Sequence, residues 1–248
     1  MTAKRRATPS KRPTRKPAAR RPAKPSAKPS AKVAAKRAGH AHGHAHGHAA
    51  PYGTKRDRHG NPTDFEAYLA RLDDPARAKW QLPDDVVAAL RLKKGGVAAE
   101  IGSGTGQFTL RMAKKVGGDG RVYAIDVEPR MLDVLAERAA KAKAWGIVGI
   151  LAPDGGGLPP EPVDAILMVN VFHHVQDRAA YLRALATRLA PAGRVAIVDF
   201  HERELPIGPP PDHKLARADA IAAVRTAGLR VIREERFLPY QYFLIAGR

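Results

Sequence analysis

The strongest constraint on the fold is an alternation of two kinds of segment. Short apolar runs rich in β-branched residues recur along the chain, and amphipathic helical patterns separate most of them. The runs cover residues 97–101, 121–125, 147–151, 165–169 and 194–199, and the helical patterns cover 107–116, 129–144 and 177–189. Uninterrupted apolar runs are typical of parallel strands that are buried on both faces. The alternation therefore predicts an α/β fold with a doubly wound, mostly parallel sheet.

The last part of the chain departs from this alternation. After a helical pattern at 215–227, two strands are expected at 230–237 and 240–246, with only Leu238 and Pro239 between them. A parallel crossover needs a dozen or more residues, so these two strands are expected to run antiparallel. The sequence thus predicts a seven-stranded sheet that is parallel except for its last strand. The segment 153–162, between the third and fourth strands, is too rich in glycine and proline for a helix to be predicted.

The positive charge is concentrated at the N-terminus. Of the 43 lysine and arginine residues, 14 lie in residues 1–50, which contain no acidic residue, while the other 198 residues carry 29 basic and 24 acidic side chains. Frequent proline and few large apolar residues predict that residues 1–51 are disordered. The composition resembles the tails of histone-H1-like proteins, which implies nonspecific contact with nucleic acid. The alternative is a solvated tail that aids solubility.

The same segment carries histidines at positions 40, 42, 44, 46 and 48. Imidazoles on a flexible chain bind zinc or nickel, but no carboxylate orients these rings, so opportunistic binding is expected rather than a catalytic metal. The chain has no cysteine and therefore neither disulfides nor thiolate metal sites. It also has no secretory signal pattern and no apolar run of about 18 residues, so we expect a cytoplasmic protein without a transmembrane segment.

Residues 52–96 are expected to form N-terminal helices that precede a domain at 97–248. Thr63 and Glu66 have the spacing of a capping box, and apolar residues at helical spacing follow as far as residue 72. A second helix is expected at 83–92, with a proline in its first turn and the pair Gly95 and Gly96 after it.

A glycine-rich loop, EIGSGTG at residues 100–106, follows the first predicted strand and precedes a helix. Gly102 and Gly104 permit a tight turn and close approach to a ligand, and Gly106 opens the helix. The loop lacks the lysine of a triphosphate-binding loop, and its third glycine comes one residue early for the dinucleotide pattern. Moreover, a carboxylate at Glu100 suits a cationic amino group better than a pyrophosphate.

Asp126 ends the second predicted strand, where a carboxylate accepts hydrogen bonds from ribose hydroxyls. NAD and S-adenosylmethionine both contain such a ribose. Asp126 therefore indicates a nucleoside without separating these two ligands, and it is also placed to cap the helix that follows.

Four segments together resemble successive motifs of class I S-adenosylmethionine-dependent methyltransferases: VAAEIGSGTG, VYAIDVEPRML, DAILMVNVFHHV and LAPAGRVAIVDF. The resemblance covers residues 97–199 and points to the broad small-molecule group that includes the ubiquinone and menaquinone C-methyltransferases. It implies a Rossmann-like methyltransferase fold, S-adenosyl-L-methionine as the cofactor, and methyl transfer to a small-molecule acceptor.

The resemblance also implies eight cofactor-binding residues: Glu100, Gly102, Ser103, Gly104, Asp126, Val127, Asp154 and Asn170. In this assignment Glu100 holds the methionine amino group, Asp126 binds the ribose hydroxyls, and the three loop residues line the methionine and ribose. Val127 packs on the adenine, and Asn170 touches the methionine end. Asp154 accepts from the adenine amino group, although APDGGG departs from the family spacing and an Asp–Gly pair is an ordinary turn.

Three histidines are candidates for a catalytic base: His173, His174 and His201. Methyl transfer from a sulfonium needs alignment of the acceptor, and a base is needed only when the acceptor loses a proton. His173 and His174 follow the fourth predicted strand and His201 follows the fifth, at the edge where ligands bind in open α/β folds. The alternative for each histidine is packing beneath the next helix.

Other segments are candidates for covering the site. The proline-rich segment 201–215 has the composition of a semi-rigid lid over the acceptor. Tyr240 and Tyr242 are placed to reach the same pocket, and Phe65, Tyr68 and Trp80 to cover the cofactor. Ordinary packing in the core is the alternative for these aromatic residues.

Several functions remain open at this point. NVFHH stands where family members that methylate nitrogen in polymers often carry NPPY or DPPY, which disfavours DNA adenine methylation. The first alternative is a methyltransferase that the basic tail recruits to nucleic acid or protein. A second is an NAD-dependent oxidoreductase, and a third is a nonenzymatic nucleoid protein that senses the cofactor. The sequence defines neither the acceptor nor the oligomeric state.

Overall fold

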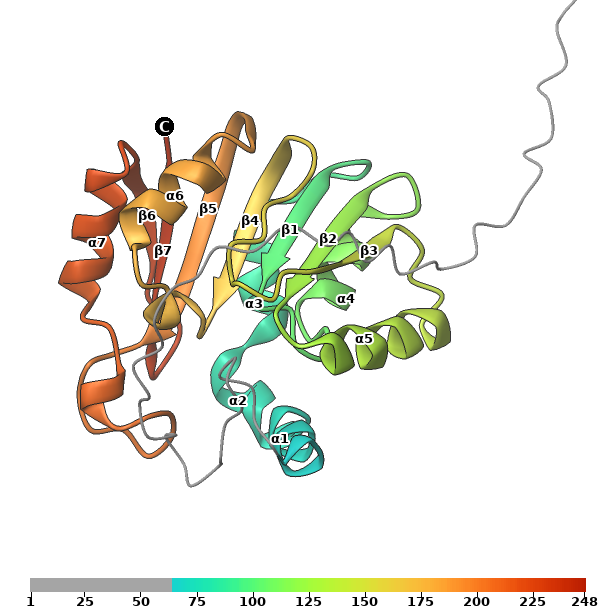
Figure 1. Cartoon of the computed structure of the whole chain (residues 1–248), viewed down its shortest axis with the longest axis horizontal. Coiled ribbons are helices and arrows are strands. Elements are labelled where there is room, and N and C mark those ends of the chain that lie inside the picture. The colour runs from blue at the N-terminus through green and yellow to red at the C-terminus, as the bar shows by residue number, and fades with distance from the viewer. Residues whose placement is uncertain (1–63) are drawn as a thin grey trace, which may run out of the picture. The chain divides into compact units, whose positions relative to one another are not determined.

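A computed structural model describes residues 64–248 (Figure 1). They form a seven-stranded sheet with the strand order β3-β2-β1-β4-β5-β7-β6. The strands are β1 (Val97–Ile101), β2 (Arg121–Asp126), β3 (Ile147–Leu151), β4 (Val163–Val169), β5 (Leu189–Phe200), β6 (Arg230–Glu235) and β7 (Gln241–Gly247). The expected tail at 1–51 and its histidine run lie outside the described residues.

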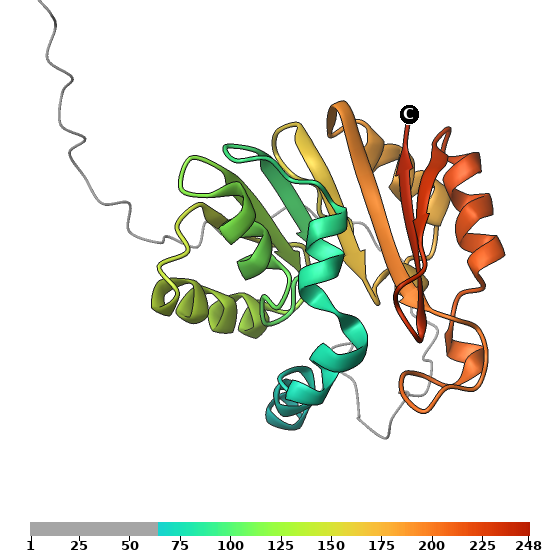
Figure 2. The same cartoon turned by 180° about the vertical axis from the view of Figure 1, so that it is seen from behind.

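Helices cover both faces of the sheet, as a doubly wound fold requires. The α-helices are α1 (Phe65–Leu72), α2 (Ala78–Gln81), α3 (Pro83–Ala89), α4 (Thr109–Val116), α5 (Pro129–Lys141), α6 (Arg178–Ala186) and α7 (Arg217–Thr226). Helices α3 and α4 pack on one face (Figure 2), and α5 extends that layer because its Leu132 lies against Gly149 of β3. Helices α6 and α7 pack on the opposite face.

The prediction of a parallel sheet with an antiparallel last strand is confirmed. Strands β1 to β5 pair in parallel, whereas β7 pairs antiparallel with both β5 and β6. Strand β7 therefore does not close the sheet at its edge but lies between β5 and β6. In this register Asp199 of β5 lies opposite Tyr242 of β7, so their side chains share one face.

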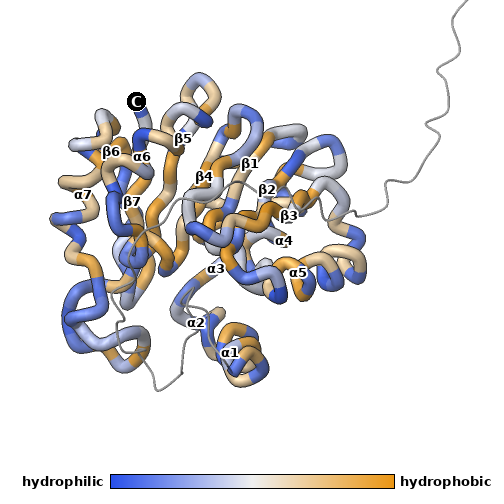
Figure 3. Tube along the Cα trace, in the orientation of Figure 1, coloured by the Kyte–Doolittle hydropathy of each residue, from blue (hydrophilic) through white to orange (hydrophobic). Residues whose placement is uncertain are grey.

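The apolar strand runs are buried as their composition predicts. Every residue of β4 except Asp164 is buried, and β7 is buried along its whole length. Figure 3 shows the hydrophobic colour following β4 and β5 through the middle of the sheet. The edge strand β3 is less covered, and its Val148 is 39% exposed. The segment between β3 and β4 contains no helix, as expected from its glycine and proline content.

The start of the first helix differs from the sequence prediction. The N-cap of α1 is Asp64, whose carboxylate accepts a hydrogen bond from the amide of Ala67 at 3.0 Å, so the predicted capping box of Thr63 and Glu66 is wrong. Helix α2 and the 3-10 helix Pro75–Arg77 were not predicted, because they are too short to show a helical period in the sequence.

Several helices end earlier in the structure than the sequence predicts. Helix α3 ends at Ala89 because Arg91 adopts a left-handed conformation, with φ of 51°. Helix α6 ends at Ala186, three residues before the predicted end, because Leu189 already pairs with Val163 as the first residue of β5. Pairing with a neighbouring strand thus overrides the local helical pattern at the end of α6.

Helix α3 belongs to the core even though it precedes the first strand. Val86, Val87 and Leu90 are buried against α4 and the sheet. The division predicted at residue 97 remains a prediction. Within residues 64–248, no helix combines the length and the apolar character needed to cross a bilayer.

Candidate active site

The glycine loop folds against the end of β2 through three backbone donors. The amides of Gly102 and Ser103 donate to the carbonyl oxygen of Ile125 at 2.8 and 3.1 Å. The amide of Gly104 donates to Oδ2 of Asp126 at 2.7 Å. The loop after β1 and the carboxylate that ends β2 therefore form one unit at the carboxyl edge of the sheet.

Gly102 also lies against the loop that follows β4. Its φ is +70°, and a Cβ at this position would come 2.3 Å from Cγ2 of Val171. Only glycine fits both the backbone conformation and this close approach. The contact brings Asn170, which precedes Val171, to the same place as the glycine loop.

Glu100 is a buried carboxyl, only 2% exposed, at the end of β1. Burial raises the pKa of Glu100 to about 8; the hydrogen bond from the Thr109 hydroxyl opposes this rise, and the charge of Asp126 adds to it. Without a cationic partner, this site holds the carboxyl mainly in its neutral form near neutral pH. A cation placed beside it would favour the charged form.

Asp126 is 8% exposed and retains capacity to bind a ligand. Burial raises its pKa, and hydrogen bonds from the amides of Glu128 and Gly104 oppose the rise. These amides occupy one acceptor position on each oxygen, Oδ1 at 3.0 Å and Oδ2 at 2.7 Å, and each oxygen has a second lone pair. Nearby, the buried hydroxyl of Ser103 has no hydrogen-bond partner in the described part of the chain.

The other predicted cofactor residues lie along the same edge. Val127 directly follows Asp126 and is half-buried. Asp154 is exposed in the turn after β3. The turn begins at Ala152, whose backbone amide donates to the carbonyl oxygen of Asp126 at 2.8 Å. Asn170 adopts a left-handed conformation with φ of 56°, and its Oδ1 accepts from Nε2 of Gln241 at 2.7 Å.

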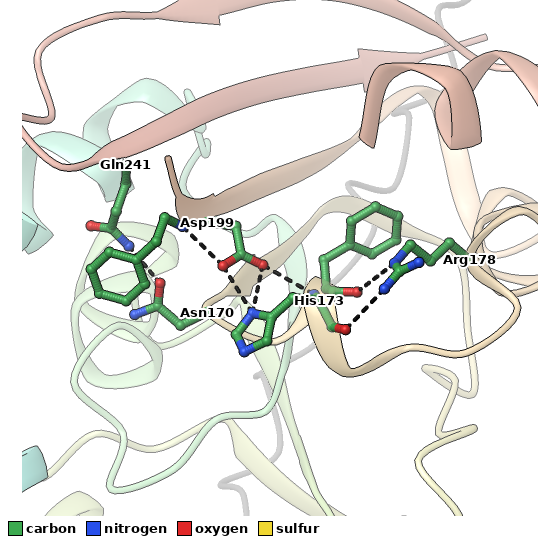
Figure 4. A network of polar contacts seen from close by, with 7 residues as sticks. Asn170, His173, Arg178, Asp199 and Gln241 are labelled. Carbon is green, nitrogen blue, oxygen red and sulfur yellow. Dashed lines mark hydrogen bonds and ion pairs between the residues drawn. The ribbon is translucent and has the colours of Figure 1, made fainter. Parts of the chain in front are cut away.

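His173 is held by a buried carboxylate that the sequence analysis did not assign. Its Nδ1 lies 2.9 Å from both carboxylate oxygens of Asp199, and its backbone amide donates to Oδ2 of Asp199 at 3.1 Å (Figure 4). Asp199 is fully buried at the end of β5. With Nδ1 donating to the carboxylate, Nε2 of a neutral His173 is left as the basic nitrogen.

Arg178 fixes the backbone around this pair. Its guanidinium donates to the carbonyl oxygen of Phe172 at 3.2 Å and to that of His173 at 2.9 Å (Figure 4). These residues form the 3-10 helix Phe172–His174, so the His173 ring is held from both its side chain and its main chain. The orientation of the His173 ring is therefore fixed by Asp199 and by the backbone around it.

The other two histidines have different surroundings. The exposed His174 ring packs against His173, with ring centroids 4.0 Å apart. His201 is half-buried, its ring lies edge-on to Tyr242, and it lines a surface hollow with Glu202, Arg203, Ala216 and Arg217. Burial, and next the charge of Arg203, lower the pKa of His201. Among residues 64–248, no cluster of three acidic or histidine side chains has the arrangement of a metal site.

The segment that contains α1 contacts the glycine loop, and its role as a cover remains a prediction. Leu72 of α1 would lie 3.9 Å from a Cβ at Gly104. Asp73, just after α1, pairs with Arg138 of α5 at 2.5 Å, and Arg138 also donates to the carbonyl oxygen of Thr105 at 3.4 Å. Phe65 lies under the guanidinium of Arg130 at 4.3 Å.

The remaining aromatic residues divide between the site edge and the core. Trp80 of α2 contacts Phe200 and Tyr240 at centroid distances of 5.7 and 6.4 Å. Tyr242 is 1% exposed and belongs to the core, which agrees with the alternative of ordinary core packing. Its hydroxyl is buried without a partner in the described residues. The predicted lid, 201–215, packs its Gly208 against the ring of Phe200.

Sequence reasoning missed Asp199, Thr109 and Gln241 as site residues. The topology carried a signal for the first, because the carboxyl ends of neighbouring parallel strands meet at one edge. His173 follows β4 and Asp199 lies near the end of β5, so the two are neighbours. The sequence contains no such signal for Gln241, because its contact with Asn170 depends on the position of β7 between β5 and β6 in the sheet.

Comparisons with known proteins agree with this geometry. Residues 99–195 match the model of a methyltransferase domain. Among solved structures, an S-adenosylmethionine-dependent methyltransferase from Aquifex aeolicus superposes with a TM-score of 0.66 at 28% identity, covering 73% of this chain and 96% of that one. This match covers a larger share of the chain than the family model does.

Among curated relatives, a 2-phytyl-1,4-naphtoquinone methyltransferase from Nostoc punctiforme is 31% identical over 116 residues, which cover 46% of this chain and 50% of that protein. A ubiquinone/menaquinone biosynthesis C-methyltransferase from Marinomonas is 26% identical over 159 residues, covering 58% of this chain and 63% of that protein. The chain thus spans about half to two thirds of the length of these relatives.

The fold is a Rossmann-like methyltransferase fold, and the glycine loop with its two carboxylates lies within the matched region. Residues 99–195 are thus similar to a methyltransferase domain, and the fold is similar to that of an S-adenosylmethionine-dependent methyltransferase.

Replacing Glu100 by glutamine is expected to stabilise the ligand-free protein most at high pH. The folded state keeps the Glu100 proton up to a pH of about 8, whereas the unfolded state loses it near 4.5, so wild-type stability falls as pH rises between these values. Glu100→Gln removes this loss. We expect its stability relative to the wild type to rise by more than about 1 kcal/mol between pH 5 and pH 8.5, measured by urea unfolding. The exposed Glu137→Gln is the control, and an equal change in both variants would contradict the prediction.

Replacing Gly102 by alanine is expected to damage the loop. The new methyl group would meet Val171 at 2.3 Å in a backbone conformation with φ of +70°. We expect a loss of about 2 kcal/mol of stability together with at least tenfold weaker binding of S-adenosylmethionine, measured by unfolding and calorimetry. Gly118→Ala, at a site with no atom within 4 Å, should leave both unchanged. Wild-type affinity in Gly102→Ala would show that the loop does not hold the cofactor.

Proposed function

We propose that this protein transfers a methyl group from S-adenosylmethionine to a small-molecule acceptor, with His173 as the general base. The observation that carries the proposal is the pair of buried carboxylates, Glu100 and Asp126, held beside the glycine loop at the ends of adjacent strands. The sulfonium cofactor supplies an activated methyl group. The protein has to bind it, align the acceptor and exclude water.

The residues present fit this cofactor. The Glu100 carboxyl would bind the methionine ammonium, and that cation would favour its charged form. The free lone pairs of Asp126 would accept from the ribose hydroxyls, with the unpartnered hydroxyl of Ser103 beside them. We assign the loop residues Gly102 and Gly104 to the lining of the same site, where a larger side chain would obstruct the ligand.

The outer contacts of the cofactor follow the strand order. Val127 would pack on the adenine ring, and Asp154 would accept from the adenine amino group. Asn170 would bind the methionine end, because its neighbour Val171 contacts Gly102. These three assignments rest on the family resemblance together with their place at the carboxyl edge.

His173 is the preferred base among the three histidines. It has an orienting carboxylate, Asp199, whereas no hydrogen bond to the His201 ring is found in residues 64–248. A base in this place serves an acceptor that loses a proton as the methyl group arrives, for example a hydroxyl or an acidic C–H group. We infer an acceptor of this chemical class.

A small molecule is favoured over a polymer as the acceptor. The relatives described above are named as quinone methyltransferases, which act on small molecules. Two hollows at the surface of residues 64–248 are lined by acidic as well as basic side chains, which is not the lining expected of a nucleic-acid groove. Contact of residues 1–50 with nucleic acid remains a prediction from composition.

The acceptor class is tested by incubating the protein and methyl-labelled cofactor with a cell extract separated into metabolite, lipid, protein and nucleic-acid fractions. We expect label in the metabolite or lipid fraction, and the same label after residues 1–50 are removed. Label in nucleic acid or protein that disappears on removal of the tail would favour the recruited-enzyme alternative. Binding of NAD without binding of S-adenosylmethionine would overturn the proposal.

His173→Ala is expected to reduce kcat by about a hundredfold or more while leaving cofactor affinity within about threefold, because the base acts on the acceptor. Asp199→Asn should alter the pH profile of kcat, since the amide no longer fixes the His173 tautomer. The matched control is the exposed His174→Ala. Activity in His173→Ala equal to that of the control would reduce the His173–Asp199 pair to a structural role.

A further inference from the structure

A buried amide pair lies next to the glycine loop, and its orientation has a chemical consequence. Gln241 is the first residue of β7 and is 1% exposed. Its Nε2 donates to Oδ1 of Asn170 at 2.7 Å, so the amino end of the antiparallel strand β7 meets the residue that follows β4 (Figure 4). We propose that Gln241 is a positioning residue that directs the Asn170 amide nitrogen toward the carboxylate of the cofactor's methionine end.

The backbone of Asn170 already limits where its side chain lies. Its φ of 56° is a conformation that asparagine tolerates better than most residues. The backbone N–H of Asn170 donates to the carbonyl oxygen of Val198 at 2.8 Å. The next residue, Val171, contacts Gly102. The side chain is thus confined between the glycine loop and β7. What remains free is the choice of which end of the amide faces the loop.

In the structure, the Oδ1 end of the Asn170 amide faces Gln241. With Oδ1 occupied as an acceptor, the two hydrogens of Nδ2 are left on the other side of the Asn170 amide. A donor of this kind recognises an anion or a carbonyl oxygen and does not bind an ammonium. Of the two charged groups at the methionine end, Asn170 is therefore matched to the carboxylate, while Glu100 is matched to the ammonium.

Gln241 itself is incompletely satisfied. Its Oε1 is buried and has no hydrogen-bond partner among residues 64–248. Leaving a buried acceptor unpaired costs about 1–3 kcal/mol, so a glutamine here needs a reason beyond filling space. Orienting Asn170 supplies that reason. This assignment rests on the proposed function, because it presupposes that the cofactor binds at this edge.

The test measures cofactor binding by calorimetry, with S-adenosylmethionine and its decarboxylated analogue as the two probes. Gln241→Met removes both polar atoms at similar volume, and Gln241→Glu keeps an acceptor but would turn the Asn170 oxygen toward the site. We expect at least fivefold weaker binding of S-adenosylmethionine to Gln241→Met and a larger loss for Gln241→Glu. Binding of the decarboxylated analogue should change by less than twofold in both variants.

A double-mutant cycle shows whether Gln241 acts through Asn170. Asn170→Gly keeps the left-handed backbone and removes the amide. In that background, Gln241→Met should alter affinity for S-adenosylmethionine by less than twofold. Equal losses in both backgrounds, or equal losses for the two probes, would overturn the positioning role.

The outcomes also separate this inference from the proposed function. A wild-type protein that binds neither probe would overturn both. A wild-type protein that binds S-adenosylmethionine, with unchanged affinity in Gln241→Met, would overturn only the role of Gln241. Thermal unfolding of each variant confirms that the protein compared is folded.

Discussion

The pairing of β1 with β4 is the constraint on which the site depends. It sets Ile101 beside Met168, so the loops that leave these two strands emerge next to each other. Gly102 and Val171 are then so close that a methyl group added to Gly102 would clash with the Val171 side chain. The binding edge is therefore not built by the loops alone. Its geometry follows from the register of two buried strands, which close packing holds in place.

A second consequence of the fold is electrostatic. Neighbouring strands β1 and β2 end in carboxyl groups, and the sheet withdraws both from water. The charge of Asp126 disfavours the charged form of Glu100 and so adds to the rise in the pKa of Glu100. A site of this kind favours a ligand that offers a cation and hydroxyl donors together.

The fold could be predicted from the sequence because it depends largely on local patterns. Apolar runs predicted the strands, and the short link at Leu238 and Pro239 predicted the antiparallel pair. Helix ends were less predictable, as Leu189 shows, because the strand pairing that ends α6 involves residues far away in sequence. The partners Asp199 and Gln241 were missed for the same reason: they meet His173 and Asn170 only once the sheet has assembled.

Strand β6 comes before β7 in the chain but joins the sheet only through it. Strand β7 cannot leave the sheet alone, since its loss from β5 would carry β6 away as well. The two strands are therefore expected to open as one cooperative unit with a shared free energy of local unfolding. Gln241 and Tyr242 are the first two residues of β7. Local unfolding of β6 and β7 would therefore also displace Gln241 from Asn170.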